Sequence, residues 1–236
     1  MDEQEILKEK FKSAISSTIK AISGDFDIDI KFGGKTDTKK NSLNLPEISI
    51  LKNLEDFTAL RALADSEALK IKYTNKKIYA DNEPKGAMAK SLYSIAEKIR
   101  YEKIGSEKLK GVKNNITQYY QSRYINKKVE EIKTETDVSI SEAFELYLRN
   151  HFFQFKENSV TQKVLSNWKD LFNKNLKDKL NDLDNCLDDQ SKFGQTILKL
   201  IDDLEFEDTN ANEKEQESEN AKDDASQSKD NEEEEN

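Results

Sequence analysis

Residues that break helices are rare in this sequence, and they nearly vanish after residue 86. Neither of its two prolines, Pro46 and Pro84, lies beyond that point, and only three of its seven glycines do. Long segments without proline or glycine favour helix over strand and turn. The sequence therefore predicts a mostly α fold with a minor β component, a helical domain with a small β-sheet or hairpin near the N-terminus.

The last thirty residues, 207–236, differ sharply from the rest of the chain. They contain thirteen Asp and Glu, three Lys, and no Val, Ile, Leu, Phe, Tyr or Trp, so their net charge is −10. The net charge of the whole chain is −9, so its acidity comes from this segment. A segment without apolar side chains cannot offset the entropy lost on ordering. We therefore predict a helical domain over residues 1–206 and a disordered acidic linker or tail over residues 207–236. The tail serves either solubility or the connection to a further module.

The N-terminal residues change from a helical to a strand-like pattern. Apolar residues at spacings of four and three predict an amphipathic helix over residues 3–23, which Gly24 ends. Residues 26–32, FDIDIKF, alternate apolar with charged side chains, as in a half-buried strand. We expect the four apolar side chains of this strand to face the helices: Phe26, Ile28, Ile30 and Phe32.

Two further segments could complete the sheet or hairpin. One is an extended stretch over Leu43–Ile50, and the other is a short strand at Lys77–Ala80 after a turn at Asn75 and Lys76. The remaining apolar spacing is helical. It predicts helices at residues 54–70, at 87–105 ending at Gly105, at 107–124, from Ser139 onward with a capping box to Glu142, at 160–174 and at 178–204.

The sequence shows no active site of its own. No glycine-rich loop precedes a Lys-Ser or Lys-Thr pair, so a P-loop is absent. The lone His151 lacks the second histidine of a zinc motif, and Cys186, the lone cysteine, has no nearby histidine to activate it. We therefore predict no catalytic, cofactor-binding or metal-binding residue in this chain.

The charge and hydropathy pattern also bears on partners and location. Residues 1–206 have a net charge near +1, which argues against nucleic acid as the main partner. The first ten residues are charged where a signal peptide would be apolar, and no apolar run is long enough to span a bilayer. We expect a cytoplasmic protein that binds neither nucleic acid nor membrane.

Four segments, in order along the chain, resemble a known family. They are AISGDFDIDIKFGG at 21–34, RALADSEALKIKY at 61–73, IRYEKIGSEKLKGVKNNI at 99–116, and LDNCLDDQSKFGQTILKLIDDLEF at 183–206. Each is similar to a segment of the T subunit of aerobic cobaltochelatase, the CobT family, whose acidic linker follows the last of them. The resemblance covers residues 14–206.

The resemblance implies a non-catalytic subunit of an ATP-driven machine. The family's T subunit acts with an AAA+ ATPase subunit on a large chelatase subunit, which inserts cobalt into a macrocycle during cobalamin biosynthesis, a ligase reaction that forms metal–nitrogen bonds. ATP with magnesium and cobalt are then used by the complex, and none is bound by this chain. Family members continue past the linker into a von Willebrand A domain with an Asp-x-Ser-x-Ser motif. This sequence lacks that motif, so we expect a truncation, a split gene or a fragment.

The matching segments single out four residues: Asp65, Arg100, Glu102 and Gly105. They are either partner contacts or structural residues, and the charged pair Arg100 and Glu102 either contacts the AAA+ subunit or is satisfied internally. Relatives often have a His-Asp pair after the Ala-Asp-Ser helix, where this chain has Tyr73-Thr74-Asn75. Two other functions stay open: a generic helical adaptor for an AAA+ ATPase, and a degenerate metallohydrolase-like ligand-binding domain.

Overall fold

The computed structural model describes residues 3–33, 41–48, 54–124, 129, 132, 137–155 and 158–204, with side chains from residue 57 onward in the third range. The chain divides into two units, Met1–Glu205 and Phe206–Asn236. The predicted disordered tail lies outside the described residues, so its disorder stays a prediction.

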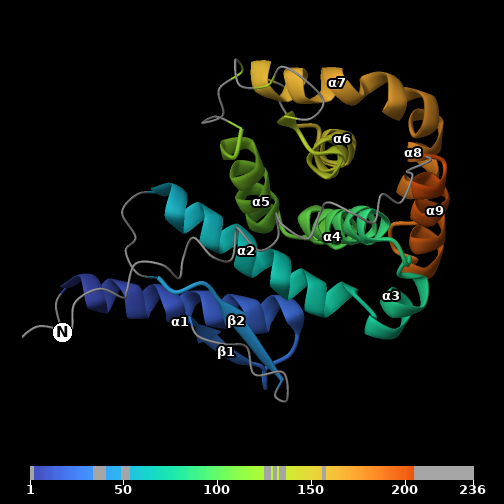
Figure 1. Ribbon diagram of the computed structural model, residues 1–236. Coiled ribbons are helices and arrows are strands. Elements are labelled where there is room, and N and C mark those ends of the chain that lie inside the picture. The colour runs from blue at the N-terminus through green and yellow to red at the C-terminus, as the bar shows by residue number, and fades with distance from the viewer. Residues whose placement is uncertain are drawn as a thin grey trace, which may run out of the picture. The chain divides into compact units, whose positions relative to one another are not determined.

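The first unit is mostly helical with a small sheet near the N-terminus, which confirms the predicted fold class (Figure 1). Its elements, in chain order, are α1 Glu3–Ser23, β1 Asp29–Phe32, β2 Ser42–Leu45, α2 Leu54–Tyr73, α3 Lys76–Asn82, α4 Ala87–Lys108, α5 Lys110–Ser122, α6 Ile140–Phe153, α7 Ser159–Asn175, the 3₁₀ turn η3 Lys177–Lys179, α8 Leu180–Asp184 and α9 Gln190–Asp202. None of the helices within the described residues is long and apolar enough to cross a membrane.

The N-terminal layer consists of α1 beside α2, with the two strands nearby (Figure 1). Gly24, at φ +77°, ends α1 as predicted, and its N–H donates to the Lys20 carbonyl at 3.0 Å. Strands β1 and β2 pair in parallel, with Asp29 opposite Ser42 and Phe32 opposite Leu45. The parallel pairing selects the sheet and excludes the hairpin, because a hairpin joins antiparallel strands.

The predicted strand at 26–32 is wrong in its first half. The Asp25 carboxylate accepts from the Asp27 N–H at 3.1 Å and from the Asn41 side-chain amide at 2.8 Å, so the chain turns before β1 begins at Asp29. Ile28 is buried at 3% exposure, whereas Phe26 is 71% exposed. The expectation that Phe26 faces the helices is therefore wrong.

We expect Ile28→Asp to destabilise the protein by about 3 kcal/mol or more, because it places an unpaired carboxylate in the core. Phe26→Asp is the matched control two residues away, and it should cost less than about 1 kcal/mol since that side chain already faces solvent. Urea denaturation of both variants measures the difference. Equal losses would contradict the burial of Ile28.

Three segments differ from the prediction. The predicted strand at Lys77–Ala80 is helix α3, because the Asn75 side chain accepts from the Lys77 and Ile78 N–H groups as a helix cap. Helix α4 continues through Gly105 to Lys108. The single helix predicted at 178–204 is broken into η3, α8 and α9, and Asp189 caps α9 by accepting from the Lys192 N–H at 3.1 Å.

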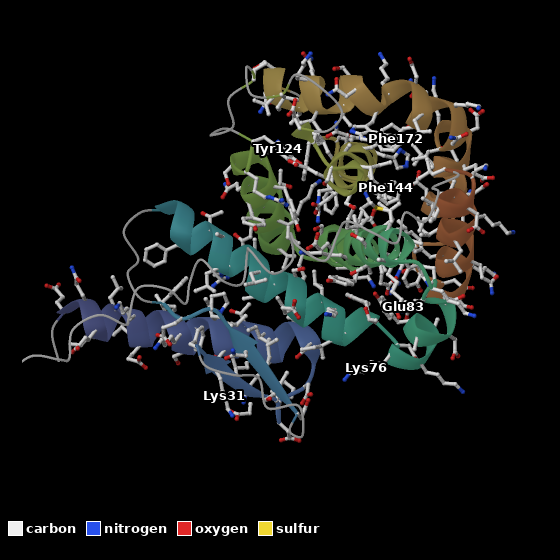
Figure 2. The ribbon with its side chains drawn as sticks, in the orientation of Figure 1. Lys31, Lys76, Glu83, Tyr124, Phe144 and Phe172 are labelled. Carbon is white, nitrogen blue, oxygen red and sulfur yellow. The ribbon has the colours of Figure 1, made fainter. Side chains whose placement is uncertain are left out.

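The helix cap predicted at Ser139 is confirmed. Ser139 caps α6, since its hydroxyl accepts from the Glu142 N–H at 3.2 Å. Aromatic rings fill the contact between α6 and α7, where the Phe144 and Phe172 rings meet edge to face at 6.3 Å (Figure 2). Helix α4 in turn contacts α2, α5, α6 and α9, so its side chains reach most of this unit.

Candidate functional site

Charged side chains are buried at the centre of the first unit, and most of them lie on α2, α4 and α6. The buried polar residues that concern the site are Asp65, Ser66, Glu97, Arg100, Glu102, Ser106, Arg149 and Gln190. Buried charges are stable only when they are paired and hydrogen-bonded. Their partners therefore show what this part of the molecule is built to hold.

The first group, here called the Glu97 cluster, comprises Glu97, Arg100, Gln190 and the Tyr73–Asn75 turn. The Arg100 guanidinium, 2% exposed, donates from Nε to Glu97 Oε2 at 2.7 Å and from Nη2 to Glu97 Oε1 at 2.8 Å. The remaining donors of Arg100 reach the Tyr73 carbonyl at 2.5 Å and the Leu187 carbonyl at 3.0 Å. A single side chain of α4 thus fixes the end of α2 and the loop before α9.

Gln190 completes this cluster from the first turn of α9. Its amide nitrogen donates to Glu97 Oε1 at 2.8 Å, and its amide oxygen accepts from the Asn75 N–H at 2.7 Å. The Thr74 hydroxyl also donates to Glu97 Oε1, at 3.3 Å. The Glu97 carboxylate is therefore surrounded by donors from three separate segments of the chain.

The second group, here called the Glu102 cluster, comprises Ser66, Glu102, Tyr120, Glu145 and Arg149. Glu102 is fully buried, and its carboxylate accepts from the Ser66 hydroxyl at 2.5 Å and from Arg149 Nη1 at 2.8 Å. Arg149 also donates from Nε to Glu145 at 2.9 Å, and its guanidinium carbon lies 3.2 Å from the centre of the Tyr120 ring. This cluster joins α2, α4, α5 and α6.

The charges of the Glu102 cluster shift the pKa values of its members in a consistent way. Burial alone would lower the pKa of Arg149, but Glu102, Tyr120 and Glu145 raise it above its ordinary value. Burial alone would raise the pKa of Glu145, but Arg149 and Arg123 hold it below its ordinary value. Both groups are thus held in their charged forms by each other.

Asp65 is buried beside these clusters, on α2 against α5. Its Oδ2 accepts from the Asn115 side-chain amide at 2.7 Å, and its Oδ1 has no hydrogen-bond partner among the described residues. Burial raises the pKa of Asp65, although the Asn115 hydrogen bond and the charge of Arg61 act in the opposite direction. The ionised form of this carboxyl is therefore penalised by folding.

The raised pKa of Asp65 predicts how its contribution to stability depends on pH. Its ionised form is disfavoured in the folded state, so stability is lost as pH rises from the unfolded pKa, about 3.9, through the raised folded pKa. We expect the free energy of unfolding of the native chain, relative to that of Asp65→Asn, to fall over this window and then level off. Urea titrations of both proteins from acid to neutral pH measure this, and a relative stability that rises with pH would contradict it.

Gly105 lies where α4 approaches α2 most closely. A Cβ atom there would overlap Cδ2 of the buried Leu69 and would lie 2.6 Å from its Cδ1. The glycine of the family segment is therefore needed for helix packing. The expected stop of the helix at this residue is wrong, because the glycine is helical and serves the contact.

We expect Gly105→Ala to destabilise the protein by about 1–3 kcal/mol through overpacking against Leu69. Gly111→Ala is the matched control on the next helix, where an added Cβ meets no atom within 4 Å. It should stabilise the protein by roughly 0.5–1 kcal/mol, since alanine is the better helix former. Thermal melts of the two variants should therefore shift in opposite directions.

The four residues expected from the sequence thus lie inside the unit and not on its surface. Arg100 and Glu102 do not pair with each other, because each has a different partner. The sequence analysis missed Glu97, Gln190 and Arg149. Only Glu97 gave a local signal, since it lies one helical turn before Arg100. The partners of Glu102 are 36 and 47 residues away, so no spacing rule could reveal them.

Two hollows adjoin the turn between α2 and α3, and Thr74 lines both. The first, here called the α3 pocket, has a volume of about 390 Å³ and is lined by side chains of α2, α3 and α4, among them Lys70, Lys76 and Tyr79. The second, here called the α9 groove, has a volume of about 730 Å³ and is lined in part by Lys72, Arg100 and Gln190. The Glu97 cluster contributes to both, since Glu97 lines the pocket and Arg100 the groove.

The arrangement offers binding surfaces and no recognisable reaction centre in the part of the chain that the structure describes. No group of three His, Cys, Asp or Glu side chains gathers there that could hold a metal ion. His151 lies at the end of α6 with its Nε2 2.8 Å from the Asp184 carboxylate, and Cys186 is buried with its Sγ 3.5 Å from the Leu183 carbonyl. The Glu102–Arg149 ion pair holds α4 and α6 together, and the α3 pocket and the α9 groove are hollows that a ligand or partner could enter.

Comparison with known protein families shows which family this chain resembles. The model of a protein family described as "Cobalamin biosynthesis protein CobT" matches residues 6–236. No solved structure matches this chain.

Proposed function

Since the chain belongs to the CobT family and so has a role in cobalamin biosynthesis, we propose that it acts as a non-catalytic subunit of a cytoplasmic, ATP-dependent cobaltochelatase. In this proposal it works with an AAA+ ATPase subunit and with a large chelatase subunit that inserts cobalt into the macrocycle. ATP, magnesium and cobalt are bound by the partners. The observation that carries the proposal is the family match over residues 6–236.

The burial of the charged side chains in the described residues favours a non-catalytic role for this chain. The buried arginines are engaged inside the unit: Arg149 of α6 pairs with Glu102 of α4, and Arg100 pairs with Glu97. Arg100 also donates to the carbonyls of Tyr73, at the end of α2, and Leu187, before α9. Catalytic groups need access to substrate, whereas Arg100, Glu102 and Arg149 are at most 2% exposed. These residues stabilise a scaffold that can present its surface to partners.

Reconstitution with purified subunits tests the proposal. The AAA+ subunit and the large subunit from the same organism are incubated with ATP, magnesium, cobalt and the macrocycle, with and without this chain. Cobalt insertion, followed by absorbance of the product, should require the chain, and the chain alone should neither hydrolyse ATP nor insert cobalt. Full insertion without it, or turnover by the isolated chain, would refute the proposal.

A further inference from the structure

The α3 pocket combines exposed cations with hydroxyl groups on a fixed wall. Lys70 of α2 and Lys76 of α3 line it, and Lys76 is labelled in Figure 2. Four hydroxyl-bearing residues are also part of the lining: Thr74, Tyr79, Ser94 and Tyr101. No aliphatic side chain is part of its lining. Sites for apolar ligands are lined mainly by hydrophobic side chains, so this pocket favours a polar occupant.

The balance of charge in the pocket is positive. Of its two carboxylates, Glu97 is neutralised by the two hydrogen bonds from Arg100, which leaves only Glu67 against the lysines. Of the three lysines in the lining, Lys98 already contacts an aromatic ring, since its ammonium nitrogen lies 5.9 Å from the centre of the Tyr120 ring. Lys70 and Lys76 are exposed and form no ion pair with any side chain in the described ranges. Two ammonium groups are therefore available to an anion from outside.

The wall behind these lysines is held in place by the Glu97 cluster. Glu97 itself is 2% exposed and accepts hydrogen bonds from Thr74, Arg100 and Gln190. The cap of α3 by Asn75 fixes Lys76 at the start of that helix. The two lysines are thus presented from elements whose relative positions are set by buried contacts, which lowers the entropy cost of binding between them.

We propose that the α3 pocket binds an acidic segment of a partner protein, with carboxylates at Lys70 and Lys76. Solvent screens each exposed ammonium group, so a single free carboxylate gains little there. A segment with several carboxylates engages both lysines at once and gains from multivalency. This inference rests on the proposed function, since it names the chemistry by which the subunit meets a partner in its complex.

Fluorescence anisotropy with a fluorescein-labelled octaglutamate peptide tests the pocket on the full chain. The test variant is Lys70→Glu with Lys76→Glu. The matched control is Lys169→Glu with Lys174→Glu, two exposed lysines of α7 with the same change in charge. At low salt, about 20 mM, we expect the test variant to lose roughly tenfold or more in affinity and the control to stay within about twofold of the native chain. Equal melting temperatures check that all three proteins are folded.

Three results would overturn the assignment. The first is no binding of octaglutamate by the native chain, and the second is an equal loss in the test and control variants, which would indicate general charge attraction. The third is displacement of the peptide by glutarate as effectively as by unlabelled octaglutamate, which would assign the pocket to a small free dianion.

The reconstitution assay separates this inference from the proposed function. If the native chain supports cobalt insertion and the Lys70→Glu, Lys76→Glu variant supports it equally with unchanged partner binding, the pocket assignment fails and the proposed function stands. If the native chain binds octaglutamate through these lysines but is not needed for insertion, the proposed function fails. Loss of partner binding in the test variant alone supports both.

Discussion

Replacing Arg149 with methionine should destabilise the protein by about 3–5 kcal/mol, because it removes one partner of a buried ion pair. The Glu102 carboxylate, fully buried, would keep only the Ser66 hydroxyl as a hydrogen-bond donor among the contacts described above. Methionine retains much of the side-chain volume over the Tyr120 ring, so the lost charge dominates over cavity formation. The melting temperature should fall by roughly 10 °C.

Arg123→Met is the matched control for this prediction. Arg123 also contacts Glu145, at 3.3 Å, but its side chain is 41% exposed. Exposed ion pairs contribute little, so the control should cost less than about 1 kcal/mol. Adding Glu102→Leu to Arg149→Met should recover much of the loss, because the uncompensated charge is removed. Equal effects of Arg149→Met and Arg123→Met would contradict the burial of the Glu102 cluster.

Replacing Arg100 with methionine is expected to have an effect of similar size, about 3–5 kcal/mol. The variant leaves the Glu97 carboxylate buried at 2% exposure without its counter-charge. It also removes the donors of the Tyr73 and Leu187 carbonyls, so the end of α2 and the loop before α9 lose a shared anchor. Besides a lower melting temperature, hydrogen exchange at the Asn75 backbone N–H, which donates to the Gln190 side chain, should accelerate.

Lys103→Met provides the comparison on the same helix. Lys103 pairs with Glu107 at 3.0 Å one turn away, with side-chain exposures of 23% and 58%. Its loss should change the free energy of unfolding by less than about 1 kcal/mol. If Arg100→Met instead melts like the native chain while partner binding is lost, Arg100 is a contact residue, and the Glu97 cluster is not the anchor that its hydrogen bonds indicate.

Local patterns predicted those features that depend on neighbouring residues. Ser139 capped α6, and Gly24 ended α1, because caps and left-handed glycines act within one helical turn. Local patterns failed where a segment was too short for its apolar spacing to distinguish a strand from a helix or a turn. Lys77–Ala80 looked like a strand, but the Asn75 side chain starts a helix there, and an Asx turn at Asp25 shortened β1.

The sequence by itself determined the helical class, the N-terminal sheet and the family. The helical class follows from the scarcity of proline and glycine, the sheet from the alternation of apolar residues, and the family from four matching segments in the same order along the chain. Only the tertiary structure decided the roles of the charged residues. Arg100 and Glu102 lie two positions apart on one helix, yet Arg100 anchors the loop before α9 through the Leu187 carbonyl and Glu102 binds Arg149 of α6. Such pairs join residues 87 and 47 positions apart, and only the packing of the helices brings them within hydrogen-bond distance, because helical spacing relates residues no more than one or two turns away.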